Sequence, residues 1–308
     1  MSDTHHETTV NELAISVIVP AYNAEATLAE TLDAIQAQSY TNWECVIVDD
    51  GSSDRTRAIA EEYAACDERF VVVSQENRGS GGAYNTGVRT ASHAFVCICS
   101  ADDVLLPEHL KGIARAIKEK PEVDIFSTNG YFWMPNGSRT IIYRGPEAKQ
   151  PHSWPLKQVI SVCFFSVGAT YRKSWFDVVN GYREDVFGED WDFWLRIMAQ
   201  GATHLFIPQA SALHRVSDFQ KSADATRAYR SDIRIIEDLI ESFDLDDEAL
   251  SAARTCIARR ETLIKQAEEA KPVRSSGPIG RIKLLIRTLL DTVFGSERIE
   301  RILRSRKR

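Results

Sequence analysis

Short β-branched segments that alternate with helical patterns constrain the fold of this chain more than any other feature. Residues 15–19 read Ile-Ser-Val-Ile-Val, and residues 45–48 read Cys-Val-Ile-Val. Continuous runs of this kind are typical of strands that are buried on both faces, as in parallel sheets covered by helices. Apolar residues at helical spacing, Leu28, Leu32 and Ile35, follow the first run. The sequence therefore begins as a strand–helix–strand unit.

The alternation continues to about residue 127. Further helices are predicted at about 54–65, 82–90 and 108–118, and further strands at 70–73, 95–99 and 123–127. Strands and helices that alternate with short connections build a parallel sheet with helices on both faces. The expected fold class is α/β, with a Rossmann-like, mostly parallel sheet. In such open sheets ligands bind beyond the carboxyl ends of the strands.

The second half of the chain is less regular. Residues 131–166 read as extended and aromatic segments, after which helices at 174–179 and 190–199 and a strand at 204–207 are expected. Beyond about residue 221 the pattern is helical, which predicts a C-terminal helical extension over 223–270. Lys271 to Gly280 is rich in proline, glycine and serine and reads as a linker.

Charge is unevenly distributed along the chain. The net charge of −7 disfavours a nucleic-acid partner, which usually requires a basic surface. Residues 273–308 alone carry ten Lys/Arg and three Asp/Glu, so this tail is basic. Six apolar positions recur there at helical spacing: Ile282, Leu285, Ile286, Leu289, Leu290 and Val293. A basic amphipathic tail over 281–308 can lie on a membrane surface, or it can pack on this chain or on a sister subunit.

The cysteines and the N-terminus bear on location. The six cysteines are scattered without a CxxC pair, which indicates reduced core residues of a cytosolic protein. Residues 1–14 read as a disordered, polar N-terminus without the apolar core of a signal peptide. No apolar run reaches the roughly 20 residues that a membrane span needs. A cytoplasmic protein is expected, with peripheral attachment to the inner face of the plasma membrane as a further possibility.

Polar clusters follow three of the predicted strands. After the first comes Pro20-Ala21-Tyr22-Asn23, in which Tyr22 could stack on a base. After the second comes Asp49-Asp50-Gly51-Ser52, in which a carboxylate could accept from a uracil or guanine imide N–H. After the fourth comes Asp102-Asp103, and paired carboxylates with substrate phosphates are a usual arrangement for Mg²⁺ or Mn²⁺. Each cluster alone can be turn chemistry, but all three are expected at one edge of one sheet.

Two other segments carry candidate chemistry. Residues 77–85 are glycine-rich and open a helix without the Walker A pattern; Arg78 there could lie near a diphosphate, or the segment could be a flexible loop. Residues 188–194 place acidic side chains in a first helical turn, where the helix dipole alone favours them. The alternative is that Asp190 is a general base beside an acceptor.

Together these segments resemble the family 2 inverting glycosyltransferases of the GT-A fold. The resemblance lies in residues 16–23, 48–54, 101–103 and 188–192, in matching order and separation, and spans about 15–222. It implies one GT-A domain over 15–222, with a donor half at about 15–127 and an acceptor half at about 128–222. The helical extension over 223–270, and the linker and tail over 271–308, lie outside it.

The resemblance also implies roles for individual residues. The residues expected to hold the nucleotide sugar are Pro20, Ala21, Tyr22, Asn23, Asp49, Asp50, Arg78, Gly82, Ala101 and Asp102. Asp103 would be the direct metal ligand, with Asp102 nearer the ribose. A bound Mg²⁺ or Mn²⁺ would neutralise the leaving diphosphate. Asp190 would take the proton of the acceptor hydroxyl, and one displacement at the anomeric carbon would invert its configuration.

Two positions depart from the family pattern. The metal motif often begins with aspartate, but Ser100 stands at that position. The segment after the last strand often reads Arg-x-His, whereas here it reads Leu213-His214-Arg215. His214 could still reach the metal or a phosphate, or it could be an ordinary packed or surface histidine.

The expected reaction is transfer of a sugar from a nucleotide diphosphate donor, with UDP-sugars favoured, to a hydroxyl of a saccharide or lipid-linked acceptor. Synthesis of cell-surface polysaccharide, lipopolysaccharide or glycolipid is the setting that the resemblance implies. The alternatives are a nucleotidyltransferase and a non-catalytic scaffold that binds nucleotide sugars. Donor base, sugar, acceptor and oligomeric state stay open.

Overall fold

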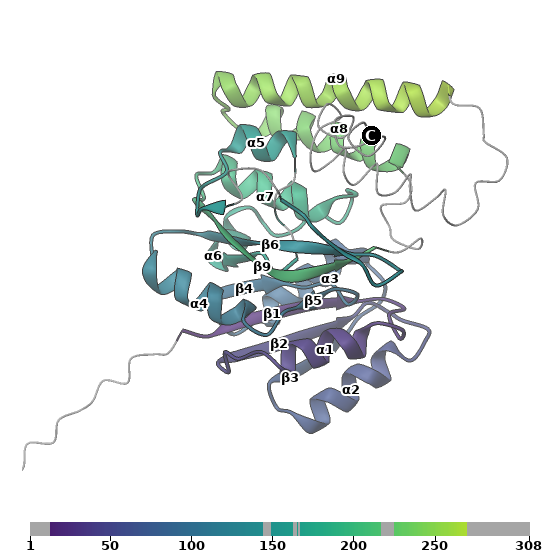
Figure 1. The fold of residues 1–308 in the computed structure, drawn as a ribbon. Helices are drawn as coiled ribbons and strands as arrows, with labels where there is room; N and C mark the ends of the chain where they lie inside the picture. The colour runs from purple at the N-terminus through teal and green to yellow at the C-terminus, as the bar shows by residue number, and fades with distance from the viewer. Residues whose placement is uncertain (1–12, 144–148, 163–164, 166, 217–224, 270–308) are drawn as a thin grey trace, which may run out of the picture.

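The computed structural model describes residues 13–143, 149–162, 165, 167–216 and 225–269. These residues form one mixed sheet of nine strands in the order β3-β2-β1-β4-β8-β6-β9-β5, with β7 paired to β6 (Figure 1). The strands are β1 (Ile15–Ala21), β2 (Trp43–Asp49), β3 (Phe70–Ser74), β4 (Phe95–Ile98), β5 (Val104–Leu105), β6 (Ile125–Trp133), β7 (Arg139–Ile141), β8 (Thr170–Arg172) and β9 (His204–Arg215). The helices are α1 (Leu28–Gln36), α2 (Thr56–Cys66), α3 (Gly79–Thr90), α4 (His109–Glu119), α5 (Leu156–Ser161), α6 (Ser174–Val178), α7 (Glu189–Ala199), α8 (Ala225–Ser242) and α9 (Asp247–Glu269).

The N-terminal half has the predicted parallel arrangement. Strand β1 pairs in parallel with β2 on one side and β4 on the other, and β2 pairs in parallel with β3. Ala21 lies opposite Asp49, and Ile18 lies opposite Ile98. Since these strands run in the same direction, their carboxyl ends and the polar residues that follow them gather at one edge of the sheet.

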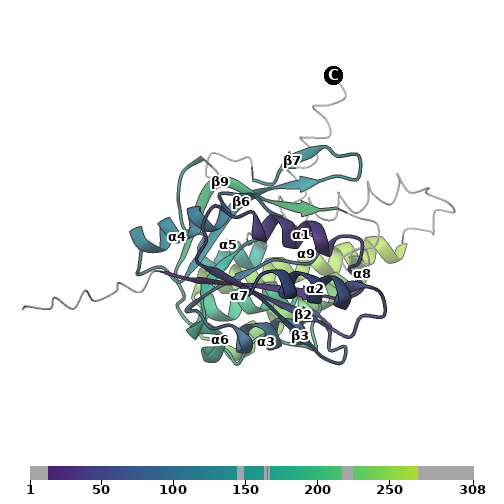
Figure 2. The same ribbon diagram turned by 90° about the horizontal axis from the view of Figure 1, so that it is seen from below.

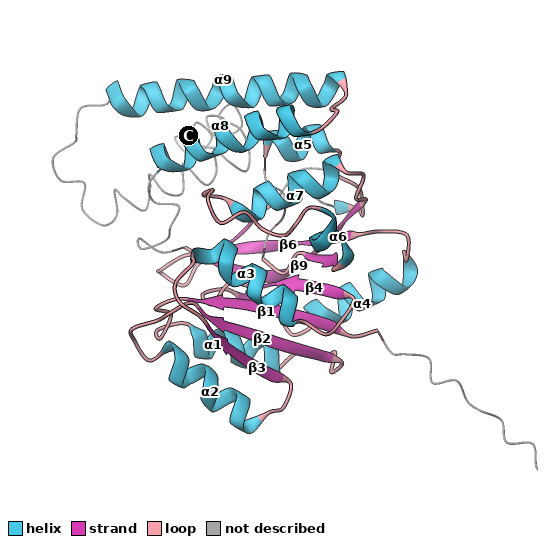
Figure 3. Cartoon of the chain, turned by 180° about the vertical axis from the view of Figure 1, so that it is seen from behind, coloured by secondary structure: helices cyan, strands magenta, loops and turns pink. Residues whose placement is uncertain are grey.

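Helices cover both faces of the sheet, as predicted. Along β1, Val17 and Val19 pack on the side of α1 and α4, whereas Ile18 packs on the side of α3 and α7. Figure 3 shows α3, α6 and α7 on the latter side, and Figure 2 shows α1 and α2 over the β1–β3 part of the sheet. Helix α3 approaches the sheet closely at Gly87, where an added Cβ would lie 2.4 Å from Ile18 Cγ2.

The sequence prediction was incomplete beyond β4. The short strands β5, β7 and β8 were not predicted, and each pairs antiparallel with its neighbours. The expectation of extended segments over 131–166 was wrong at α5, where Leu156–Ser161 is helical. Strand β9 was expected to end at residue 207, but it continues to Arg215 alongside β6. Pro208 breaks the alternating pattern there, and the register shifts opposite it, between Thr128 and Gly130. A bulge of this kind is where a strand tolerates proline.

The predicted helical extension is present as α8 and α9, which lie side by side above α7 (Figure 1). Arg260 of α9 is 2% exposed, and its Nε donates to Asp232 of α8 at 2.7 Å. None of the helices built by the described residues has the length and apolar character that a bilayer crossing requires. The predicted N-terminal segment (apart from residues 13–14) and the linker and basic tail lie outside the described residues.

The cysteines follow the prediction with one exception. Cys45, Cys97, Cys99 and Cys256 are buried free thiols, but Cys66, the last residue of α2, is exposed. The expectation of a buried residue was wrong at this position because the outer side of α2 faces solvent. Cys163 lies outside the described residues.

Candidate functional site

The loops that follow β1 and β2 are connected by hydrogen bonds. Asn23 adopts a positive φ of 48°. Its backbone N–H donates to Ser52 Oγ at 3.0 Å, and its Oδ1 accepts from the backbone N–H of Ser53 at 2.9 Å. Ala24 N–H donates to Thr56 Oγ1 at 2.7 Å. These bonds hold a loop in which the neighbouring Tyr22 side chain is 55% exposed and accessible to a ligand.

The two carboxylates at the end of β2 are both buried. Asp49 and Asp50 are each 3% exposed. Asp49 Oδ1 accepts from the backbone N–H of Ser52 at 3.2 Å, which closes the turn. Asp50 Oδ1 accepts from Gln75 Nε2 at 2.7 Å and from the backbone N–H of Arg78 at 2.9 Å. Asp50 therefore links the end of β2 to the start of α3.

Side chains of α1 and of its N-cap contact the backbone of the Asp102–Asp103 turn. Thr27 Oγ1 donates to the carbonyl of Ala101 at 2.9 Å. Thr31 Oγ1 lies 3.0 Å from the same carbonyl and 2.8 Å from that of Asp103. These contacts fix the backbone of the turn, and Asp103 is 2% exposed.

The extension of β9 carries His214 and Arg215 to this turn. His214 Nδ1 lies 3.2 Å from Asp103 Oδ1 and 3.4 Å from Oδ2. Arg215 donates its backbone N–H to Asp103 Oδ1 at 3.0 Å and its Nε to the carbonyl of Asp102 at 2.9 Å. Its guanidinium also pairs with Glu30 of α1. Both Asp103 and the turn are thereby bound to β9.

Charges in this cluster perturb one another. Burial, followed by the negative charge of Asp103, raises the pKa of Asp102 to about 6. Burial alone would lower the pKa of His214, but Asp103, then Asp102 and Asp190, raise it to about 9. His214 is therefore held as a cation by carboxylates, in a cluster with an excess of negative charge.

Asp190 lies in the first turn of α7, within electrostatic reach of the same cluster. Its Oδ1 accepts from the backbone N–H of Trp191 at 2.7 Å. The charge of Asp190 also acts on Tyr84. Burial, followed by this charge, raises the pKa of Tyr84 well above its usual value. The structure thus brings Asp103 and His214 into contact and places Asp190 within electrostatic reach of His214, from three distant parts of the chain.

A family model matches the part of the chain that carries the donor-side loops. The model of Glycosyl transferase family 2 matches residues 16–180. The chain belongs to this family. The GT-A fold that the sequence resemblance implied is thereby confirmed. Asp190 and His214 lie beyond the matched segment.

Relatives and solved structures agree with the family assignment. A curated relative, UDP-Glc:alpha-D-GlcNAc-diphosphoundecaprenol beta-1,3-glucosyltransferase WfgD of Escherichia coli, is 34% identical over 103 residues, which are 33% of this chain and 40% of WfgD. The first curated relatives are covered over 18% to 54% of their length. Staphylococcus aureus TarS 1-349 in complex with UDP-GlcNAc has a TM-score of 0.66 at 20% identity, covering 91% of this chain and 82% of that one. The mannosyltransferase PcManGT from Pyrobaculum calidifontis in complex with GDP-Man and Mn2+ has a TM-score of 0.60 at 18% identity, covering 92% and 87%.

The side chains of this family member suit a hard divalent cation. Asp102 and Asp103 are adjacent carboxylates, and burial, followed by the negative charge of Asp103, raises the pKa of Asp102. Such a pair is stabilised by Mg²⁺ or Mn²⁺, which prefer carboxylate oxygens and take further ligands from substrate phosphates and water. Within the described residues no three His, Cys, Asp or Glu side chains form a ready metal-binding group.

Arg78 is paired with a carboxylate in this structure. Its guanidinium pairs with Glu184, with Nε to Oε2 at 3.2 Å and Nη2 to Oε1 at 2.5 Å. Gly82 packs against it, since an added Cβ would lie 2.5 Å from Arg78 Cβ. The structure therefore connects Arg78 and Gly82 to the loop before α7, and a contact with the nucleotide stays a prediction.

Three contacts of the candidate site were not predicted from the sequence. They are those of Gln75 with Asp50, of Glu184 with Arg78, and of Arg215 with Asp103. Gln75 and Glu184 stand outside any recognisable motif, because their partners are more than 20 residues away in the chain. For Arg215 a signal was available, because this residue directly follows His214, which was considered as a metal or phosphate contact.

Proposed function

We propose that this chain is a metal-dependent, inverting glycosyltransferase that moves a sugar from a UDP-sugar to an acceptor hydroxyl. The observation that carries the proposal is the meeting of buried Asp103 with His214 at 3.2 Å, at the sheet edge where the donor loops also end. Support comes from the fold shared with TarS, which was solved with UDP-GlcNAc, and with PcManGT, which was solved with GDP-Man and Mn2+.

The donor side of the site would hold the nucleotide through the loops after β1 and β2. In the described part of the chain, both partners of Asp50 bind Oδ1. Its Oδ2 is therefore the oxygen that would accept an imide N–H of the base. The exposed ring of Tyr22 would stack on that base, as aromatic rings do on nucleobases. Pro20, Ala21, Asn23 and Asp49 would shape the loop that receives it.

Asp103, with Asp102 beside it, would hold Mg²⁺ or Mn²⁺. When bound, the ion would neutralise charge on the leaving diphosphate. Ala101 and Asp102 would lie at the ribose. His214 would contact the metal as a neutral imidazole, or a phosphate as the cation that it is beside Asp103.

The acceptor side would use Asp190. Its carboxylate would take the proton of the acceptor hydroxyl while that oxygen attacks the anomeric carbon from the face opposite the diphosphate. A single displacement of this kind inverts the anomeric configuration. A lipid-linked saccharide acceptor is consistent with the activity that the name of WfgD states, in which the acceptor is a diphosphoundecaprenol derivative. Assembly of a cell-surface polysaccharide is the corresponding role.

A product assay with Mn²⁺ tests the proposal. UDP-glucose, UDP-galactose and UDP-N-acetylglucosamine are incubated with the protein and with lipid-linked or saccharide acceptors. Glycosyl transfer releases UDP, nucleotidyl transfer releases pyrophosphate, and a scaffold releases neither. Asp190→Asn should lower UDP release by about 100-fold or more, since a general base contributes about 10² to 10⁴ in rate. The matched control is Asp244→Asn, at an exposed position after α8.

The assignment of Asp190 fails if Asp190→Asn keeps the turnover of Asp244→Asn. Release of pyrophosphate, or of no product from any donor, would contradict the reaction itself.

A further inference from the structure

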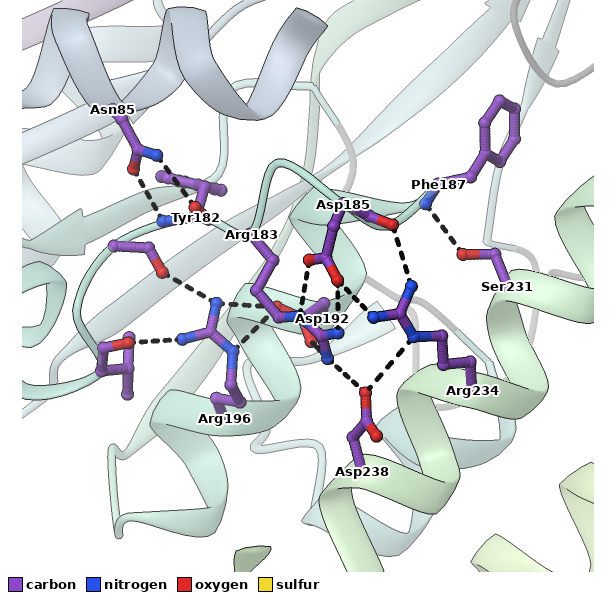
Figure 4. A network of polar contacts seen from close by, with 12 residues as sticks. Asn85, Tyr182, Arg183, Asp185, Phe187, Asp192, Arg196, Ser231, Arg234 and Asp238 are labelled. Carbon is purple, nitrogen blue, oxygen red and sulfur yellow. Dashed lines mark hydrogen bonds and ion pairs between the residues drawn. The ribbon is translucent and has the colours of Figure 1, made fainter. Parts of the chain in front are cut away.

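The loop between α6 and α7 leads directly to Asp190 and is bound on two sides. On the α3 side, Tyr182 N–H donates to Asn85 Oδ1 at 2.8 Å, and Asn85 Nδ2 donates to the carbonyl of Tyr182 at 2.9 Å. On the α8 side, the backbone N–H of Phe187 donates to Ser231 Oγ at 2.8 Å. Figure 4 shows both attachments. The loop therefore joins the donor half of the fold to the helical extension.

Arg183 lies at the centre of this loop and has acidic partners from three elements. Its Nη1 donates to Asp238 of α8 at 2.6 Å and lies 3.6 Å from Asp192 Oδ1 of α7. Its Nε and Nη2 donate to the two oxygens of Asp185 in the loop, at 3.2 Å each. Asp185 is also paired with Arg234 of α8. One guanidinium thus connects the loop, α7 and α8 (Figure 4).

Asp192 is the buried member of this network. Its side chain is 3% exposed, and its Oδ2 accepts from Arg196 Nε at 2.8 Å. Arg196 in turn donates to the carbonyl of Gly181 at 2.8 Å. A buried carboxylate is costly unless it is paired and hydrogen-bonded. Arg196 lies on α7 and would turn with Asp192. Rotation of α7 is therefore opposed by the contact of Asp192 with Arg183 and by the bonds from Arg196 to the carbonyls of Val179 and Gly181.

The rotation of α7 determines where Asp190 points. Successive residues of an α-helix are about 100° apart, so Asp190 and Asp192 project in nearly opposite directions. Asp192 faces the network at α8, whereas Asp190 acts electrostatically on His214 and Tyr84 at the candidate site. Gly188, with φ of 97°, ends the loop and begins the helix. Fixing Asp192 therefore fixes the direction of Asp190.

We propose that Arg183 is a positioning residue. It links Asp192 of α7 to Asp238 of α8 and so directs Asp190 toward the acceptor. This inference rests on the proposed role of Asp190. Helix α8 then completes the acceptor side of the site, although it lies outside residues 16–180 that the family model matches. The extension is part of the catalytic unit.

Turnover of Arg183→Gln, measured as UDP release with Mn²⁺ from the three UDP-sugars named above, tests the proposal. Misplacing a catalytic group by about 1 Å can cost about 10²-fold in rate. We expect kcat to fall by about 10- to 100-fold, while affinity for UDP, measured by calorimetry, stays within about twofold. Arg183→Lys should keep more activity than Arg183→Gln, because it keeps the charge but loses the fork of donors.

The matched control is Arg230→Gln. Arg230 is an arginine of α8 and, like Arg183, is in an ion pair, in its case with Glu268 at 2.9 Å. It is exposed and does not contact Asp185, Asp192 or Asp238 in the described part of the chain. Asp238→Asn, whose side chain is 39% exposed, gives a second variant that perturbs the network from α8 if Arg183→Gln folds poorly. It should lower kcat in the same direction. Equal kcat in Arg183→Gln, Asp238→Asn and Arg230→Gln would overturn the proposal.

A double mutant separates this proposal from the role of Asp190. If Arg183 acts through Asp190, then Arg183→Gln should cause no further loss in an Asp190→Asn background. Multiplied losses would mean that Arg183 acts on its own. If Asp190→Asn alone has no effect, then the assignment of the base fails instead.

Amide hydrogen exchange gives a readout that needs no turnover. Arg183→Gln should speed exchange at residues 181–192 relative to Arg230→Gln, with no change at β1 or β2. Unchanged exchange in that segment would contradict the positioning role whatever the activity.

Discussion

Two buried histidines show how single residues make the stability of this fold depend on pH. His109 is fully buried, with Nδ1 2.8 Å from Ser211 Oγ and Nε2 3.1 Å from the carbonyl of Gly168. Burial lowers its pKa to about 4. His204 is 4% exposed, and burial, followed by the charge of His152, lowers its pKa to about 3. Both side chains are neutral in the folded protein near pH 6.

Acidification should therefore destabilise the fold above the pH at which ordinary carboxylates titrate. Below pH 6.5 the unfolded chain binds a proton at each histidine that the folded chain does not bind until about pH 4 or below. Stability is consequently lost as the pH falls through that window. Between pH 7 and pH 5 the free energy of unfolding of the wild type should fall by about 2 kcal/mol more than that of His109→Gln. Urea unfolding at both pH values measures it.

The control is His93→Gln, whose side chain is 32% exposed. That variant should keep the pH dependence of the wild type. If His109→Gln keeps it as well, then His109 does not titrate as its burial requires.

At this scale the sequence predicted some contacts and not others. Asp50 and Asp103 could be singled out because each lies within a few residues of the carboxyl end of a buried strand, where parallel sheets place ligands. Glu184 could not, because it lies 106 residues from its partner Arg78 and outside any motif. Long-range pairing of exposed charges leaves no local pattern in the sequence.

Among the elements, α1 has a role beyond covering the sheet. Thr31 is fully buried, and its hydroxyl lies within hydrogen-bond distance of the carbonyls of Ala101 and Asp103. Farther along the chain, Gln38 donates to the carbonyls of Leu105 and Leu106 at 3.1 and 2.9 Å. The segment that carries the candidate metal ligands is thus supported by α1 and the residues after it.

Thr31→Val should loosen this segment. The substitution keeps the side-chain shape but removes the hydroxyl. The carbonyl of Asp103 then loses the hydroxyl as its partner, at a cost of about 1 to 3 kcal/mol. Urea unfolding should show that loss, and Mn²⁺-dependent UDP binding should weaken. Thr90→Val removes a hydroxyl with a similar bond, 2.9 Å to the carbonyl of Thr86, at an exposed position of α3. Equal stability of the two variants would contradict the supporting role of Thr31.

Elements with a clear period were predicted well, and those without one were not. Strands β1 and β2 and helix α7 follow buried runs or helical spacing. The strands β5, β7 and β8 have two or three residues each, too few to show any alternation. Strand β9 was cut short at Pro208, although the bulge opposite it lets the strand continue. Its unpredicted end carries His214 to Asp103.

For the molecule as a whole, the basic tail is the part whose partner is still a prediction. Residues 273–308 have an excess of seven positive charges and an apolar face at helical spacing. We expect the full chain to co-sediment with vesicles of phosphatidylglycerol and phosphatidylcholine at low salt and to be released at high salt. The chain ending at residue 269 should stay in solution. Equal sedimentation of the two chains would exclude the tail as the membrane contact.

Asp103 is proposed to hold a divalent cation whose ligand set a nucleotide diphosphate completes. Calorimetric titration with UDP, in Mn²⁺ and in EDTA, of the wild type, Asp103→Asn and the exposed control Asp244→Asn tests this role. GDP and dTDP, titrated in the same way, identify the base. We predict that the wild type and Asp244→Asn bind UDP in Mn²⁺ and lose most of that affinity in EDTA, while Asp103→Asn binds weakly in both. UDP binding of equal strength in EDTA, or undiminished Mn²⁺-dependent binding by Asp103→Asn, would contradict the account.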